Sequence, residues 1–398
     1  MSRLAAATSV MTSTGQLALD GLLGGFAGAL PMRTVDVASA NFVNTLLSSH
    51  GIREESSEVR AVEVETQDIQ TVSSNCNNLV IEVQWSPAGS MPDTLFLKLP
   101  CAELATRWFC NTIGVWELEC EFFRRFSGDF PVRLPKAYAA ATRRSRFALL
   151  QENLHEDPTV ELFVNADMTI GPSKERVEAC LRTLARVHSF YHGWSTEERE
   201  RRLPLSLHPF LSPRMNAISR FMNQRAVAPC RQKAPASFPA ETAALYQRAM
   251  QHWDALLAWW YREPLTLVHG DSHLGNFFVD GTAMGMLDFQ AAHWGKGIRD
   301  VQYFLIDSVP TSTLADHEEE FVRYYVAELA AFGVDLPFAT AWEQYRAYSF
   351  QTLMTIVVSL GLGPLTEKDS LMEEILRRAV AAVERVDFAG WLENTILE

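Results

Sequence analysis

The sequence predicts an α+β protein with a small β-rich first half and a larger, mainly helical second half. Runs of alternating apolar and polar residues lie between residues 60 and 151, as in half-buried strands. After residue 176, apolar residues mostly recur every three or four positions, which is the period of amphipathic helices. One strand-and-turn segment, 265–290, interrupts the helical half.

In the first half we expect strands over 60–65, 79–85, 94–99, 136–141 and 147–151. The turn residues of 86–92 separate the second strand from the third, which predicts a hairpin-like connection. Residues 111–126 predict a helix with an aromatic apolar side. Residues 1–40, which are rich in Ala, Ser, Thr and Gly, predict an N-terminal extension.

In the second half, three helical faces carry regularly spaced apolar residues: Val177, Leu181, Leu184, Val187 and Tyr191; Leu245, Ala249, Trp253, Leu256 and Trp260; and Met372, Ile375, Ala379, Val383 and Val386. Apolar stripes of this kind usually face a core. We therefore interpret the two tryptophans of the second stripe as core residues rather than as part of a ligand cage.

Charge and cysteine content exclude several classes of protein. The 398 residues include 35 Lys and Arg and 48 Asp and Glu, giving a formal net charge of −13, whereas a nucleic-acid protein needs a clustered basic face. The six cysteines form no C-x-x-C pair, which favours reduced thiols in a cytoplasmic protein. No apolar run reaches the ~20 residues that span a bilayer, so we expect no membrane insertion. The oligomeric state stays open.

The segment 265–290 carries the residues best suited to chemistry. Asp271, Asn276 and Asp288 lie at loop or strand-end positions between apolar strands. A carboxylate beside an acceptor hydroxyl can orient or take its proton. An amide five residues later and a second carboxylate across the hairpin are the hard oxygen ligands that suit Mg²⁺ on nucleotide phosphates.

His269-Gly-Asp-x-x-x-x-Asn276 followed by Asp288-Phe-Gln290 resembles the signature of the aminoglycoside phosphotransferase and choline kinase-like superfamily. The His-Gly-Asp version of the motif, and Asp-Phe-Gln in place of Asp-Phe-Gly, resemble the branch that includes ecdysteroid kinase-like proteins. The resemblance implies a protein-kinase-like fold of two lobes, with a small antiparallel β-rich N-lobe and a larger helical C-lobe. It implies that Asp271 is the catalytic base, that Asn276 and Asp288 bind Mg²⁺, and that His269 anchors the catalytic loop.

The same template divides the chain into an N-terminal extension (1–40), a nucleotide-binding lobe (41–151), and a lobe with the catalytic loop, metal site and substrate-binding helices (152–398). A kinase-like nucleotide-binding lobe needs a lysine on a strand to bind the phosphates and a glutamate on a helix to hold that lysine. Lys98, inside an apolar strand, fits the first role. Glu119 fits the second, with Glu117 and Glu121 as alternatives of register.

The loop expected to cover the phosphates, 71–78, contains no glycine, unlike the loop of protein kinases. Its small Ser and Asn residues, among them Ser74 and Asn75, can still present backbone N–H groups to phosphate. The hinge implied by the resemblance is 149–154. There the Glu152 carbonyl and the Leu154 N–H would hydrogen-bond adenine.

Two further segments resemble the family. The helix of 184–192 predicts packing roles for His188 and His192, and Asp300 is expected to cap or brace the region after the metal-binding strand.

These features predict a kinase that uses ATP and Mg²⁺ to phosphorylate a hydroxyl group of a small molecule. The alternative is a pseudokinase that binds nucleotide or a partner without transfer. Gly-Asp-Ser272 also resembles a hydrolase nucleophile motif, but no Asp-x-x-His occurs in the chain to complete it.

The acceptor and the choice between ATP and GTP stay open. The acidic run 316–320 would suit an aminoglycoside, and the aromatic-rich helical half would equally suit a steroid or another apolar alcohol; hydroxy acids and amino alcohols also remain candidates.

Overall fold

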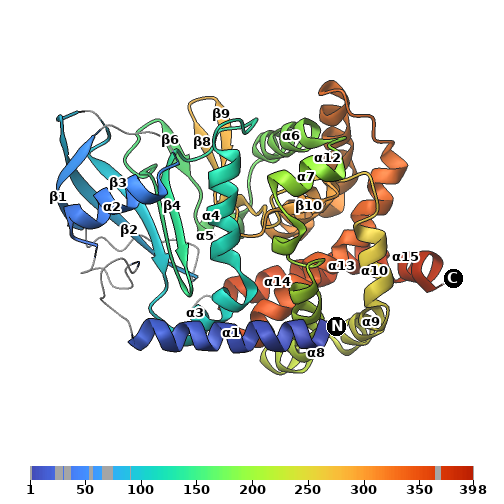
Figure 1. Cartoon of the computed structure of the whole chain (residues 1–398). Coiled ribbons are helices and arrows are strands. Elements are labelled where there is room, and N and C mark those ends of the chain that lie inside the picture. The colour runs from blue at the N-terminus through green and yellow to red at the C-terminus, as the bar shows by residue number, and fades with distance from the viewer. Residues whose placement is uncertain are drawn as a thin grey trace. The chain divides into compact units, whose positions relative to one another are not determined.

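The structure is a computed structural model that describes residues 2–22, 30, 37–52, 57–64, 75–89, 91–363 and 369–397. Contacts divide the chain into two compact units, coloured along the sequence in Figure 1. Unit 1 comprises Arg3–Leu162 and Phe278–Ala291, and unit 2 comprises Phe163–Phe277 and Ala292–Glu398. Unit 1 is rich in strands and unit 2 is mainly helical, so the predicted α+β class is confirmed. The predicted functional division into lobes stays a prediction.

Unit 1 is built on a five-stranded antiparallel sheet of order β1-β2-β3-β5-β4. Its strands are β1 (Glu58–Val64), β2 (Cys76–Ser86), β3 (Thr94–Pro100), β4 (Ala137–Arg143) and β5 (Arg146–Glu152). Each overlaps a strand expected from alternating residues. Helix α2 (Ala40–His50) shares an apolar cluster with Leu97 and Leu99 of β3. Because side chains alternate along a strand, Lys98 lies on the opposite face.

The helix predicted over 111–126 is two helices, α3 (Leu104–Ile113) and α4 (Val115–Phe126). Gly114 separates them with a φ of +80°, a left-handed conformation that glycine adopts without steric cost. Helix α4 contacts β4 and β5, beside which Figure 1 draws it, and it buries Phe122, Phe123 and Phe126. The turn at Gly114 therefore lets α4 start independently of α3.

The N-terminal residues form a long helix, α1 (Ser2–Leu22), that is held in unit 1 by polar contacts. Asn111 Nδ2 of α3 donates to Ser13 Oγ at 2.6 Å and to Gln16 Oε1 at 2.8 Å. At the end of α1, Asp20 Oδ2 accepts from the backbone N–H of Ser145 at 3.1 Å and from its hydroxyl at 2.5 Å. These contacts join α1 to α3 and to the turn between β4 and β5.

A second, three-stranded sheet combines β6 (Val160–Leu162), β8 (Phe277–Asp280) and β9 (Ala283–Met286). Arg133 joins this sheet to the end of β5, because its side chain pairs with Asp280 at 3.0 Å and with Glu152 at 2.5 Å. The hairpin of β8 and β9 delivers Asp288 two residues after its second strand, as predicted.

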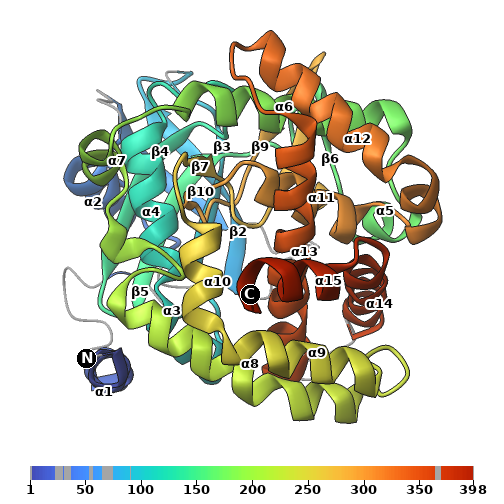
Figure 2. The same ribbon diagram turned by 90° about the vertical axis from the view of Figure 1, so that its right-hand side faces the viewer.

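Unit 2 contains the remaining helices: α5 (Asn165–Ile170), α6 (Lys174–Tyr191), α7 (Thr196–Arg202), α8 (Pro213–Lys233), α9 (Ala240–Gln251), α10 (Trp253–Trp260), α11 (Ile298–Ser308), α12 (Thr311–Ala331), α13 (Phe338–Leu362), α14 (Asp369–Arg385) and α15 (Phe388–Leu392). Helices α8 and α9 run side by side, and α13 contacts α8, α11 and α14 (Figure 2). The predicted core tryptophans, Trp253 and Trp260, are fully buried.

In unit 2, the segment that carries Asp271 and Asn276 begins at β7 (Thr266–Val268), which pairs antiparallel with β10 (His293–Gly295). It ends in the short 3-10 turn η3 (Leu274–Asn276). Among the described residues, no helix is both long and apolar enough to cross a bilayer. The cytoplasmic location stays a prediction.

Candidate active site

In unit 1 the structure brings together Lys98, Glu119 and Asp288. Lys98 Nζ donates to Glu119 Oε1 at 2.7 Å and lies 3.5 Å from Asp288 Oδ1. All three side chains are buried. Burial alone would lower the pKa of Lys98, but the carboxylates of Asp288 and Glu119 raise it above its usual value. Lys98 is therefore a fixed cation on the α4 face of the sheet.

The structure selects one of the three possible registers for the glutamate on α4. Glu117 is exposed, and Glu121 pairs with Arg124 and Arg125 at 2.5 and 2.8 Å. Only Glu119 among the three reaches Lys98. Burial raises the pKa of Glu119, and the positive charge of Lys98 offsets part of this rise.

Asp288 has an unusual backbone, with a φ of +63°. Aspartate tolerates this left-handed region better than most residues. Phe289, the next residue, stacks on Phe122 of α4 with ring centroids 3.9 Å apart, and Gln290 Nε2 donates to Asp288 Oδ1 at 2.5 Å. Packing and a hydrogen bond thus hold the strained residue. The motif located Gln290, but sequence reasoning missed that it holds Asp288.

In unit 2 the loop predicted to be catalytic, 269–276, holds Asp271 through several hydrogen bonds. Its N–H donates to His269 Nδ1 at 3.1 Å, and its carbonyl accepts from Asn276 Nδ2 at 2.7 Å. Tyr303 of α11 donates its hydroxyl to Asp271 Oδ1 at 2.8 Å. The Asp271 side chain keeps 30% of its surface, so the carboxylate is both oriented and accessible.

Asp300, which we expected to cap or brace the region after the metal-binding strand, instead braces the start of this loop. Its carboxylate accepts from the backbone N–H of His269 at 2.6 Å and of Gly270 at 3.0 Å. His188 lies 3.3 Å away through Nε2 and contacts Tyr325 through Nδ1. Burial would raise the pKa of Asp300, but His188 and Arg299 hold it below its usual value. The buried Asp300 carboxylate therefore fixes the backbone at the start of the loop.

Of the residues expected to contact nucleotide, Ser74 lies outside the described residues. Asn75 directly precedes β2. The Glu152 side chain accepts from the Lys136 N–H at 2.7 Å and pairs with Arg133, and the Glu152 N–H donates to the Lys136 carbonyl at 2.8 Å. Leu154 is buried just after β5.

The donor chemistry of these residues fits Mg²⁺ and a nucleotide. The Asn276 side-chain N–H donates to the Asp271 carbonyl, so the side-chain oxygen of Asn276 is the atom that can bind a cation. The carboxylate of Asp288, in unit 1, is likewise a hard oxygen ligand of the kind that Mg²⁺ prefers. The buried Lys98 ammonium is suited to phosphate oxygens.

The acidic run 316–320 is largely engaged within unit 2. Glu318 is buried and pairs with Arg385 at 2.6 Å, Glu319 pairs with Arg323 at 3.3 Å, and Glu320 pairs with Lys174 at 2.5 Å. The run therefore offers few unpaired carboxylates to a polycation.

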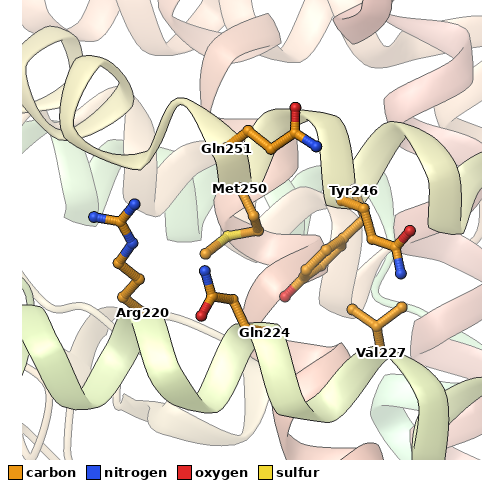
Figure 3. Close-up of a pocket in the computed structure, with 7 residues that line it drawn as sticks. Arg220, Gln224, Val227, Tyr246, Met250 and Gln251 are labelled. Carbon is orange, nitrogen blue, oxygen red and sulfur yellow. The ribbon is translucent and has the colours of Figure 1, made fainter.

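A separate cavity of about 340 Å³ lies between α8 and α9. Its lining residues are Arg220, Gln224, Val227, Tyr246, Gln247, Met250 and Gln251. Figure 3 shows side chains of the two helices pointing toward one another across it, with Val227, Tyr246 and Met250 as its apolar part. None of its lining residues belongs to the predicted site, so we do not assign the cavity to the active site.

Comparison with known structures returned similar folds. One is a choline/ethanolamine kinase family protein from Mesorhizobium loti, with 14% identity over 84% of this chain and 93% of that one, at a TM-score of 0.49. Another is a choline kinase from Streptococcus pneumoniae, with 11% identity over 82% and 94% at 0.47. A third is an aminoglycoside 2'-phosphotransferase, with 14% identity over 81% and 93% at 0.44.

Comparison with curated proteins returned no significant match. The family comparison did. The ecdysteroid kinase-like family matches residues 74–336, which are 263 of the 398 residues and span Lys98, Glu119, Asp271, Asn276 and Asp288. The ecdysteroid kinase-like branch expected from the motifs is confirmed. The chain belongs to the ecdysteroid kinase-like family.

Proposed function

We propose that the protein is an ATP- and Mg²⁺-dependent kinase that transfers the γ-phosphoryl group to a hydroxyl group of a small molecule. The observation that carries the proposal is the buried Lys98 ammonium, which lies 2.7 Å from Glu119 and 3.5 Å from Asp288. Burying a cation between two carboxylates is costly, and replacing such a group by apolar residues is often neutral or stabilising. A role in phosphate binding supplies a reason to retain it.

On the nucleotide side, Lys98 would compensate the charge of the phosphates, and Glu119 would hold the lysine in place. Asn75 and Ser74 would offer backbone groups to phosphate, while the Glu152 carbonyl and Leu154 N–H would bind adenine. Asn276 and Asp288 would hold the metal. When bound, Mg²⁺ would neutralise developing phosphate charge.

On the acceptor side, Asp271 would orient the hydroxyl and take its proton. Its carboxylate is held by Tyr303 and remains accessible, which suits that role. His269 and Asp300 would keep the loop in position. Most of the rate enhancement in phosphoryl transfer comes from positioning and electrostatic stabilisation, which these contacts serve.

The test is a phosphotransfer screen with purified protein, ATP and MgCl₂ against aminoglycosides, steroids, hydroxy acids and amino alcohols. We expect acceptor-dependent ADP release and a product 80 Da heavier than the acceptor. Nucleotide binding without transfer to any acceptor in the panel would instead favour the pseudokinase.

Asp271→Ala should separate chemistry from nucleotide binding. Loss of the base should lower kcat with the best acceptor by about 10²–10⁴-fold, while MgATP affinity stays within about 2-fold. Single-turnover phosphotransfer and nucleotide titration measure the two quantities. Full activity in this variant would remove Asp271 from the mechanism.

A further inference from the structure

One face of helix α11 makes hydrogen bonds to successive residues of the loop predicted to be catalytic. Asp300 accepts from the N–H groups of His269 and Gly270, and Tyr303 donates to Asp271. Ser308, at the end of the helix, accepts from the Leu274 N–H at 2.8 Å. The polar residues of this face and their loop partners thus follow one another in register.

Asp307 lies one turn beyond Tyr303 on the same helix, so its side chain shares the face that meets the loop. It is 2% exposed. Yet no described residue donates a hydrogen bond to its carboxylate, and its Oδ1 is buried without a partner in the described part of the chain. Among the polar residues of this face, Asp307 is therefore the exception.

None of the charged groups around Asp307 donates a hydrogen bond to its carboxylate among the described residues. Burial raises the pKa of the Asp307 carboxyl to about 6, and the neighbouring charges that act on it are those of His273, Asp271 and Arg378. Arg378 instead donates to the backbone carbonyls of Met168, Thr169 and Asp307 itself, at 2.8–3.1 Å.

The loop side offers a second unsatisfied group. His273 lies 3.9 Å from Asp271 Oδ2 through Nε2, whereas its Nδ1 is buried without a partner among the described residues. The buried imidazole nitrogen thus belongs to a residue that lies 3.9 Å from Asp271. The buried carboxylate lies one helical turn beyond Tyr303, which donates to Asp271. Native proteins rarely leave such groups unsatisfied without a reason.

We propose that Asp307 is a specificity-determining residue of the acceptor site, and that it accepts a hydrogen bond from a second donor group, hydroxyl or protonated amine, that the acceptor carries next to its reactive hydroxyl. This inference rests on the proposed function, because it places the acceptor at Asp271. A site built to bind such a donor discriminates strongly against analogues that lack it, since the analogue leaves the buried carboxylate unpaired.

The kinetic test compares three probes of one skeleton: cyclohexanol, trans-1,2-cyclohexanediol and trans-2-aminocyclohexanol. Wild-type protein should prefer the two compounds with a neighbouring donor by at least about 10-fold in kcat/KM. In Asp307→Asn that preference should fall about 10-fold or more. Preference for the amine over the diol would identify the donor as a cation.

A stability test needs no acceptor. Because the unpaired carboxylate disfavours the native state, Asp307→Asn should raise the Tm at pH 8 by about 2–4 °C. A raised pKa contributes stability at low pH that is lost as the pH rises through about 6, so the gain should shrink toward pH 4. The matched control is Glu318→Gln, which breaks a buried carboxylate pair with Arg385 and should lower the Tm without changing probe preference.

The outcomes separate the two proposals. A lowered Tm in Asp307→Asn would mean that the carboxylate already has a partner within the protein, and would overturn the inference. So would an unchanged probe preference, which would point to a buried water as the partner. Absence of turnover by wild-type protein with these probes and with every acceptor of the wider panel would overturn the proposed function, and this inference with it.

Discussion

At the scale of single residues, Tyr303 makes a contact whose contribution can be isolated. Its hydroxyl donates to Asp271 at 2.8 Å, and the surrounding burial and the Asp271 carboxylate raise the pKa of Tyr303 well above its usual value. It therefore stays a donor at neutral pH. Tyr303→Phe removes the donor but keeps the ring. We expect kcat to fall about 10-fold, because the Asp271 carboxylate becomes less well oriented, while KM for MgATP is unchanged.

The matched control for that variant is Tyr348→Phe. Tyr348 is equally buried and donates its hydroxyl to the Trp260 carbonyl at 2.7 Å. Losing either hydrogen bond should cost about 1–2 kcal/mol of stability. If both variants lost kcat alike, the effect would follow from stability and Tyr303 would have no positioning role.

Residue identity was predictable where a motif has fixed spacing. Asp271, Asn276 and Asp288 follow from local sequence, and Lys98 is a charge in an otherwise apolar strand. Tyr303 and Asp307 gave no such signal. All residues of α11 are buried, so no polar or apolar face distinguishes them, and their position opposite the loop is set by tertiary packing.

At the scale of elements, α1 shows how polar contacts can fix a helix with few charged residues in unit 1. Asp20 accepts two hydrogen bonds from Ser145 and lies 3.8 Å from the buried Arg146. Arg146 also donates to the Asp20 carbonyl at 2.7 Å. The side chain of Asp20 is thus the anion that accompanies a buried guanidinium.

Asp20→Ala should therefore destabilise the protein by about 2–4 kcal/mol, because Arg146 loses its countercharge and Ser145 loses its acceptor. Chemical denaturation measures the change. Asp93→Ala, which alters an exposed carboxylate of the same unit, is the control and should change stability by less than about 0.5 kcal/mol. Equal effects of the two substitutions would show that Asp20 does not anchor α1.

Strands were more predictable than helix ends. The alternation in 79–85 and 94–99 is strong because one face of the sheet packs on α2. The predicted start of the helix over 111–126 was wrong. The apolar periodicity continues through Gly114, although the backbone there is left-handed and one helix ends before it. One glycine changed the geometry without changing the pattern.

At the scale of the whole molecule, the order of elements along the chain was predictable, but the grouping of contacts was not. The hairpin that carries Asp288 follows the catalytic loop in sequence, yet its contacts assign it to unit 1, where it meets Arg133 and Thr159. Such pairing between distant segments leaves no periodic signal in the sequence.

Ligand binding should register in the stability of the whole chain. If MgATP binds only the native state, a concentration of 100 times its Kd should stabilise the protein by about 2.7 kcal/mol, which raises the Tm. Excess EDTA should remove most of this shift, because Asn276 and Asp288 would then hold no metal. Lys98→Met should abolish it even with Mg²⁺, since the phosphates lose their cation, and this variant should also melt earlier because Glu119 stays buried and unpaired. Differential scanning calorimetry with and without MgATP measures both effects. A full MgATP-induced shift in Lys98→Met would exclude Lys98 from the nucleotide site, and a full shift in EDTA would exclude the metal.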